Sequence, residues 1–131
     1  MSKTLEKVKP APDTEAGKLN DLIVDAIQDI KGKEIVKLDL RKVKDAPADY
    51  FIICQGESNT QIRAISDNIY RRVKDTLNTA PSHVEGSVNA HWILVDYFNI
   101  VVHVFYPETR SFYDLEDLWS DAEFTHYDNL D

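Results

Sequence analysis

The stretch that decides the fold is HWILVDYFNIVVHVFY, residues 91–106. Two apolar, β-prone runs, residues 91–97 and 100–106, flank the dipeptide Phe98-Asn99. Such a pattern predicts a β-hairpin whose loop has two residues. In that register Trp92 lies opposite Phe105 and Leu94 lies opposite His103.

Alternation along both strands sorts the side chains of the hairpin onto two faces. One face is apolar throughout, which predicts that it packs on the core: Ile93, Val95, Tyr97, Ile100, Val102 and Val104. The other face mixes large apolar groups with an acid and an imidazole: Trp92, Leu94, Asp96, Val101, His103 and Phe105. This mixed face is either a protein interface centred on Trp92, or it is covered by a helix, with Asp96 and His103 hydrogen-bonded to each other as diagonal neighbours.

The chain before the hairpin predicts two helices and two strands. Apolar residues recur at helical spacing from Ala16 to Ile30, between a capping Asp13 or Thr14 and a terminating Gly32. Residues 34–40 alternate like a half-buried strand, and residues 50–54 form the short apolar run that is typical of a central strand buried on both faces. Ser58-Asn59-Thr60-Gln61 then fits a capping box at the start of a second helix, which residues 78–82 terminate.

The rest of the chain predicts shorter elements. Residues 83–86 are expected to be extended, and Asp114 to cap a final short helix with a shared apolar face: Leu115, Leu118, Trp119 and Ala122. Together these patterns predict one α/β domain, residues 14–122, with a single mixed β-sheet flanked by helices. A flexible arm, residues 1–13, precedes it, and an acidic C-terminal tail, residues 123–131, follows it.

The composition indicates a folded chain with an acidic end. The 131 residues are 43% hydrophobic and carry a net charge of -8, which excludes disorder throughout. No Lys or Arg follows Arg110, so residues 1–113 carry fifteen basic against sixteen acidic side chains. A nucleic-acid binder needs clustered cations, so we predict no direct sequence-specific nucleic-acid binding and favour basic protein partners.

The cysteine and hydropathy patterns indicate the compartment. The single cysteine, Cys54, excludes an intramolecular disulfide framework and every multi-cysteine metal motif, which favours a reducing environment. No apolar run approaches the ~20 residues that span a bilayer, and the N-terminus lacks the apolar core of a signal peptide. We therefore expect a cytoplasmic protein without a membrane partner.

Catalytic chemistry finds little support in the sequence. Asp96 and His103 could form an acid–base pair, but Cys54 lies in an apolar strand, where a thiol is inert, and no other nucleophile is indicated. Gly56-Glu57-Ser58 could receive a phosphate at a helix N-terminus, although the capping box explains Ser58 without a ligand. No metal-ligand spacing occurs. We predict no catalytic residue, no cofactor and no metal.

The chain contains a series of short motifs in this order: DYFIIC at residues 49–54, Gly56-x-Ser58-x-x-Gln61, Glu85-Gly86, WILVD at 92–96, VVHVF at 101–105 and Arg110-x-x-Tyr113-x-Leu115-Glu116-x-Leu118-Trp119. From about Gly17 to Ala122 their order and spacing resemble the Iojap family of ribosomal silencing factors. The resemblance implies a nucleotidyltransferase-like fold that has kept the scaffold without the chemistry. In agreement, no Asp-x-Asp pair follows Gly56-Glu57-Ser58 to hold magnesium.

The resemblance also implies a function. Members of this family bind the large ribosomal subunit through ribosomal protein L fourteen, prevent the small subunit from joining and repress translation when nutrients are scarce. The contact candidates are then the mixed face of the hairpin, Trp92, Leu94, Asp96, Val101, His103 and Phe105, with Tyr113 added on the family motif alone. We expect the free protein to form a homodimer through the same patch. A nucleotide-handling enzyme on this scaffold and a dimeric structural module are the alternatives.

The hairpin tip departs from the family pattern. Family members commonly have Gly-Asp there, because a two-residue turn of this kind needs positive φ. Here the tip is Phe98-Asn99, and Phe tolerates positive φ poorly. Either the loop is longer than two residues or Phe98 is itself a partner contact.

Overall fold

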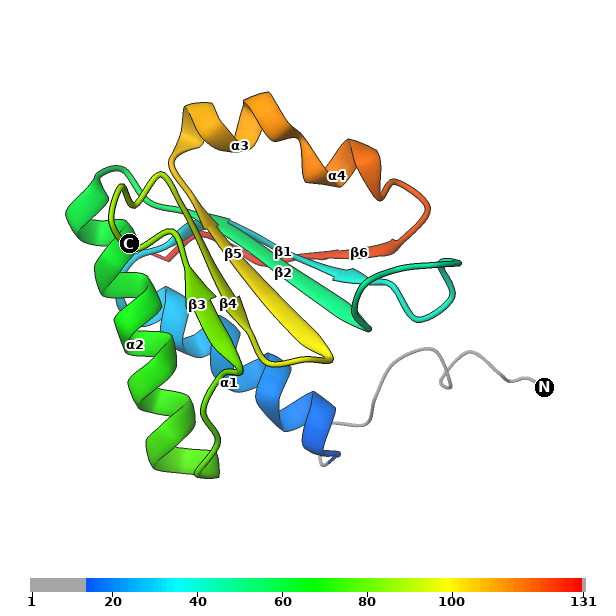
Figure 1. The fold of residues 1–131 in the computed structure, drawn as a ribbon, viewed down its shortest axis with the longest axis horizontal. Helices are drawn as coiled ribbons and strands as arrows, with labels where there is room; N and C mark the ends of the chain where they lie inside the picture. The colour runs from blue at the N-terminus through cyan, green and yellow to red at the C-terminus, as the bar shows by residue number, and fades with distance from the viewer. Residues whose placement is uncertain (1–13, 131) are drawn as a thin grey trace.

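A computed structural model describes residues 14–130, and the predicted arm, residues 1–13, lies outside them. Three layers stack on one another (Figure 1). Helices α1 (Glu15–Asp29) and α2 (Asn59–Leu77) cover one face of a β-sheet, and the short helices α3 (Pro107–Tyr113) and α4 (Leu115–Leu118) lie on the other.

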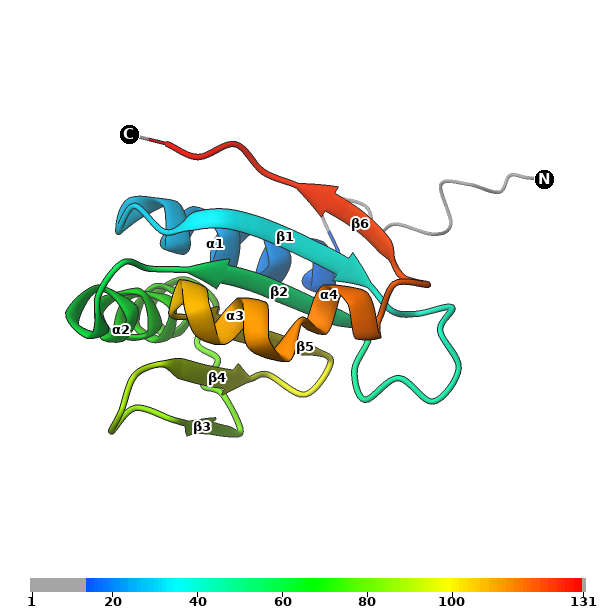
Figure 2. The same ribbon diagram turned by 90° about the horizontal axis from the view of Figure 1, so that it is seen from above.

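The sheet has six strands: β1 (Lys33–Asp39), β2 (Tyr50–Gln55), β3 (His83–Glu85), β4 (Trp92–Asp96), β5 (Ile100–Phe105) and β6 (Glu123–His126). Their order across the sheet is β3-β4-β5-β2-β1-β6, as Figure 2 shows from above. β2 and β5 pair in parallel, and the other neighbours pair antiparallel. The predicted mixed sheet flanked by helices is confirmed.

The hairpin has the predicted register and a two-residue loop. Trp92 pairs with Phe105, and the N–H of Tyr97 donates to the carbonyl oxygen of Ile100 at 2.8 Å. Phe98 takes the positive φ, 72°, that the tight loop requires. The Asp96 carboxylate accepts a hydrogen bond from the Phe98 N–H at 2.7 Å, which helps to hold this unfavourable conformation.

Both predicted N-terminal caps are formed. The Thr14 hydroxyl oxygen accepts from the Gly17 N–H at 3.0 Å, and the Ser58 hydroxyl oxygen accepts from the Gln61 N–H at 3.1 Å. The Gln61 side chain accepts from the Glu57 N–H and also donates to the carbonyl oxygen of Ile30. Gln61 therefore joins the start of α2 to the end of α1.

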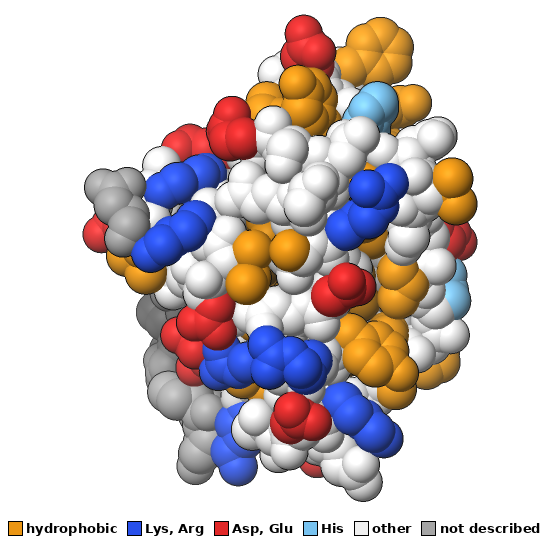
Figure 3. Space-filling model, turned by 90° about the vertical axis from the view of Figure 1, so that its left-hand side faces the viewer, with side chains coloured by type: hydrophobic (Ala, Val, Ile, Leu, Met, Phe, Trp, Pro, Cys, Tyr) orange, Lys and Arg blue, Asp and Glu red, His pale blue; other side chains and the backbone are white. Residues whose placement is uncertain are grey.

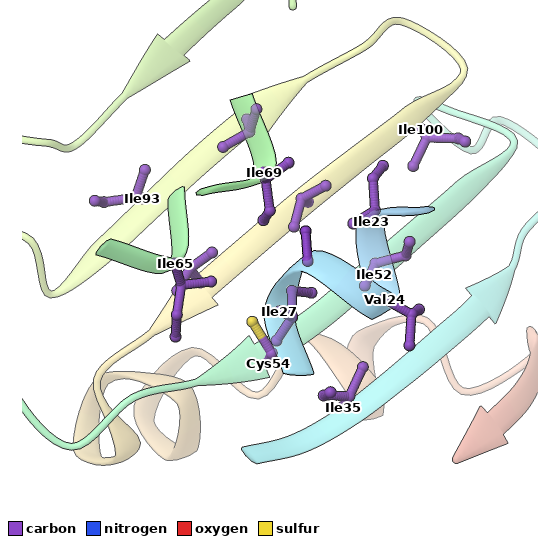
Figure 4. Close-up of a cluster of buried hydrophobic side chains, with 14 of the residues drawn as sticks. Ile23, Val24, Ile27, Ile35, Ile52, Cys54, Ile65, Ile69, Ile93 and Ile100 are labelled. Carbon is purple, nitrogen blue, oxygen red and sulfur yellow. The ribbon is translucent and has the colours of Figure 1, made fainter. Parts of the chain in front are cut away.

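The main core lies between the sheet and helices α1 and α2. Isoleucines of the two helices, among them Ile23, Ile27, Ile65 and Ile69, point toward the strands (Figure 4). All six residues of the predicted core face of the hairpin belong to this cluster and are at most 5% exposed. That prediction is confirmed.

The final helical segment differs from the prediction. Asp114 was expected to cap a helix with its side chain, but it has a left-handed backbone, φ 47°, and makes no side-chain cap bond within residues 14–130. It separates α4 from α3, which begins at Pro107 and was not predicted. Leu115 and Trp119 pack on the sheet, whereas Leu118 is 68% exposed, so the predicted shared apolar face is wrong at Leu118. The left-handed residue and the brevity of α4 change the direction in which these side chains point.

The segment expected to be an acidic tail contributes β6 to the edge of the sheet. β6 pairs antiparallel with β1, matching Val36 with His126. Beyond it the Asn129 side chain accepts from the Glu34 N–H and donates to the Glu34 carboxylate, both at 2.8 Å. The first of these bonds satisfies the Glu34 N–H, which lies before the residues of β1 that pair with β6.

Candidate functional site

The mixed face of the hairpin divides into a covered and an open half. On β5, Val101, His103 and Phe105 are 8%, 4% and 0% exposed and belong to a second apolar cluster. On β4, Trp92 and Leu94 remain half-buried. The reason is visible in Figure 2, where α3 and α4 lie across β5 and β2 while β4 extends beyond them.

The prediction that all residues of the mixed face are exposed to a partner is therefore wrong for three of them. Val101, His103 and Phe105 pack beneath the helices, with Leu115 and Trp119 above them. Alternation placed these side chains on the correct face, but it carries no information on what covers a face. Of the predicted contact residues on the hairpin, Trp92, Leu94 and Asp96 stay accessible.

Asp96 and His103 do not form the pair that the sequence analysis considered. The Asp96 carboxylate accepts from the Phe98 N–H, and its other oxygen lies 3.7 Å from Nδ1 of His83. His103 Nδ1 instead accepts a hydrogen bond from the indole N–H of Trp92 at 3.1 Å. Burial lowers the pKa of His103 to about 4, so its ring is neutral at pH 7. An acid–base pair is absent here because the carboxylate is turned toward the loop.

Trp92 is the centre of an aromatic cluster that joins the hairpin to α3. Its ring centroid lies 4.9 Å from that of Phe105 beneath it and 4.7 Å from that of Tyr113 on α3. Tyr113 is 50% exposed. The family motif alone had added Tyr113 to the candidates, and the structure brings it into contact with Trp92.

Sequence reasoning missed the exposed aromatic residue beside this cluster. Phe112 is 80% exposed, and its ring lies 5.0 Å from that of Tyr113. We call Trp92, Leu94, Phe112 and Tyr113 the apolar platform. A hollow of about 620 Å³ adjoins it, between α3 and the loop before β4, where Val88 is 87% exposed. The signal that could have found Phe112 was Pro107, a typical first residue of a helix.

The rim of the platform is acidic. The Arg110 side chain is bound within the protein, because its guanidinium donates to the Glu116 carboxylate and to the Glu34 carbonyl oxygen, both at 2.8 Å. Exposed carboxylates remain on and after α3: Glu108, Asp114, Asp117 and Asp121. On the face that presents α2, by contrast, basic and acidic side chains are interspersed (Figure 3). Glu108 lines the hollow beside Phe112 and Tyr113, so acidic charge borders the platform there.

The features that suggested chemistry have structural explanations. Ser58 and Gln61 bind backbone N–H groups at the start of α2, which are the groups that would receive a phosphate. Cys54 is fully buried, and burial raises the pKa of its thiol to about 12, so it stays protonated. Within residues 14–130 no group of three His, Cys, Asp or Glu side chains is placed to hold a metal ion.

None of the helices within residues 14–130 is both long and apolar enough to cross a membrane.

Comparisons with known proteins agree on one family. A family model described as "Ribosomal silencing factor during starvation" matches residues 13–131. The chain is 40% identical over 106 residues to ribosomal silencing factor RsfS of Bacillus subtilis, covering 79% of this chain and 86% of that protein. It is 36% identical over 104 residues to the protein of the same name from Halalkalibacterium halodurans, covering 79% and 87%. A crystal structure of a Chromobacterium violaceum protein matches with a TM-score of 0.77 at 34% identity, covering 82% and 88%.

Proposed function

The chain belongs to the family of ribosomal silencing factors, which regulate translation, and on that premise we propose that it binds the large ribosomal subunit through its apolar platform. The proposed contact is ribosomal protein L fourteen, and the proposed consequence is that the small subunit cannot join. Translation would then be repressed under nutrient limitation. The proposal needs no catalytic group or cofactor, and it places the protein in the cytoplasm.

The observation that carries the proposal is the half-buried Trp92 held between Phe105 and Tyr113. Aromatic residues that are packed on one side and accessible on the other supply most of the binding energy at protein interfaces. Ordering such a ring before binding also reduces the entropy lost on association. Leu94 and Asp96, which leave the same face of β4, extend the proposed contact along the strand.

The acidic rim indicates the charge of the partner. Glu108, Asp117 and Asp121 are exposed, and no Lys or Arg follows Arg110 in the sequence. A cation-rich ribosomal protein is complementary to such a surface. Because physiological salt screens exposed charges beyond ~8 Å, the rim is expected to increase the association rate and to orient the complex more than to strengthen it.

We also propose that the free protein pairs with a second copy through the platform. Exposed Phe112 and Tyr113 are costly to leave in water, and a two-fold dimer is the simplest arrangement that covers them. The dimer and the ribosome complex would then compete for one surface. Light scattering over a range of concentrations tests this, and a strictly monomeric protein at high concentration would contradict it.

The test of the main proposal is co-sedimentation with purified ribosomal subunits. The wild-type protein should migrate with the large subunit and reduce the proportion of joined ribosomes. Tyr113→Glu should abolish both effects, because it places a charge in the middle of the platform. If the wild-type protein neither migrates with the large subunit nor changes subunit joining, the proposed function is wrong.

Tyr70→Glu is the matched control. Tyr70 is 46% exposed, close to the 50% of Tyr113, but it lies on α2, on the opposite side of the sheet. The Tyr70→Glu variant should therefore bind the large subunit like the wild type. If Tyr113→Glu also binds like the wild type, the platform is not the docking surface.

A further inference from the structure

The imidazole of His103 has an unusual position for a polar ring. It is 4% exposed, and the rings of Phe51 and Phe105 lie beside it with centroids 4.5 and 6.2 Å away. An indole N–H can only donate, so Nδ1, 3.1 Å from Nε1 of Trp92, must be an acceptor. The ring is therefore the neutral tautomer that carries its proton on Nε2.

The Trp92 bond is the one polar contact of this imidazole within residues 14–130. Nε2 has no hydrogen-bond partner there, and the Asp96 carboxylate binds the loop instead. An aliphatic residue would pack among the same aromatic neighbours without leaving a buried N–H unpaired, which is destabilising. Stability alone does not explain an imidazole at this position.

We propose that His103 is a positioning residue. By accepting the indole N–H, it holds the Trp92 ring against Tyr113 and so prepares the platform for its partner. A Trp side chain has several staggered rotamers. Of these, only an orientation that brings Nε1 over β5 reaches Nδ1 of His103. This inference rests on the proposed function, since it assigns to His103 an indirect part in binding in place of direct contact.

The same bond indicates the chemistry of the group that covers Trp92. The indole N–H already has its acceptor inside the protein, so a partner does not need to supply one. The accessible part of the ring is apolar, and an aliphatic or aromatic side chain covers it without leaving a polar atom unpaired. The partner should therefore place an apolar side chain on Trp92 and its Lys or Arg side chains over the acidic rim.

The first experiment uses the unmodified, nitrogen-15-labelled protein. The chain has two tryptophans, so the spectrum contains two indole N–H signals, and the Trp92→Phe variant identifies which is which. We expect slow solvent exchange of the Trp92 indole proton and a scalar coupling across the hydrogen bond to a His103 ring nitrogen. Fast exchange without the coupling would overturn the inference, and this measurement does not depend on ribosome binding.

The second experiment compares His103→Leu with His103→Asn. Asn places an amide oxygen close to the position of Nδ1, whereas Leu fills the space without an acceptor. With circular dichroism establishing the fold, His103→Leu should weaken co-sedimentation with the large subunit about tenfold, and His103→Asn should restore it. Equal binding by His103→Leu and the wild type would overturn the inference.

A double-mutant cycle separates positioning from general weakening of the core. Phe has no N–H, so in a Trp92→Phe background His103→Leu should cause no further loss of binding. If His103→Leu weakens binding as much in that background as in the wild type, His103 acts through core stability and the inference is wrong. If the wild-type protein fails to bind the large subunit while the indole coupling is present, the proposed function fails and the positioning of Trp92 stands.

Discussion

The two faces of the sheet are covered to very different extents. Helices α1 and α2, with 15 and 19 residues, lie over one face, and the hairpin side chains that point toward them are at most 5% exposed. Helices α3 and α4, with 7 and 4 residues, lie over the other, and the β4 side chains there stay half-exposed. The first face is therefore wholly covered. On the second face the side chains of β5 are buried, whereas those of β4 remain at the surface. The part that the short helices do not reach is where a partner can bind.

The largest expected effect comes from placing the same charge on the two faces of one strand. Val95→Glu would bury an unpaired carboxylate beneath α1 and α2, where Val95 is 0% exposed, and should abolish folding. Leu94→Glu, its neighbour on the open half, should cost about 1 kcal/mol and leave the protein folded. Circular dichroism with chemical denaturation measures both.

If Leu94→Glu unfolds the protein as Val95→Glu does, the open half of the second face is core and the platform does not exist as a surface. If Leu94→Glu is folded but binds the large subunit normally, the surface exists and the partner docks elsewhere.

The next largest effect is a pH dependence of the unfolding free energy that comes from the buried His103. Its pKa is about 4 in the folded protein and 6.5 in the unfolded chain, so the unfolded chain takes up the proton first as the pH falls. The resulting stability is complete above pH 6.5 and is lost progressively between pH 6.5 and 4, up to about 3 kcal/mol. Denaturation at several pH values measures it.

The control for this prediction is His103→Asn, which cannot titrate. The difference in unfolding free energy between wild type and variant should shrink or reverse toward pH 4, because other groups contribute equally to both. A difference that is constant from pH 7 to pH 4 would show that His103 is not buried as a neutral ring.

A smaller effect is expected where α3 is attached to the sheet. Arg110 is 11% exposed and binds Glu116, the Glu34 carbonyl oxygen and the Gln55 amide oxygen. Arg110→Met should cost about 2 kcal/mol, since it removes several hydrogen bonds made by a charged group, among them the pair with Glu116, and should weaken large-subunit binding by loosening α3. Arg72→Met is the matched control, because Arg72 pairs with exposed Asp25 and Asp29 on the α1–α2 side. Such surface pairs contribute about 0–1 kcal/mol, so equal losses in the two variants would contradict this account.

The smallest effect concerns the cap of α2, on the fully covered side. Ser58→Ala should cost about 1 kcal/mol by loss of the hydrogen bond to the Gln61 N–H. ATP or GTP with magnesium should leave the melting temperature unchanged. A rise of several degrees would mean that a nucleotide binds the folded protein, and it would favour the nucleotide-handling alternative.

The elements that could be predicted are those whose sequence pattern lies within a few neighbouring residues. The hairpin register follows from strand alternation and a two-residue loop, and the cap at Ser58 follows from the spacing to Gln61. α3 has no buried residue, so it has no apolar period to detect. β6 has only four residues, and its position depends on pairing with β1 from far away in the chain. These two elements were invisible for that reason.

For the candidate site, the sequence by itself determined which side chains share a face, because the direction of a side chain alternates at every residue of a strand. It placed Trp92 and His103 together on the face opposite to Val95. Only the tertiary structure decided that Trp92 is accessible while His103 is buried, since this depends on where α3 and α4 come to rest. That position is determined by contacts between distant residues, such as Arg110 with the Glu34 carbonyl oxygen 76 residues away. A local pattern holds no information about contacts of that range, and they divide the face into core and docking surface.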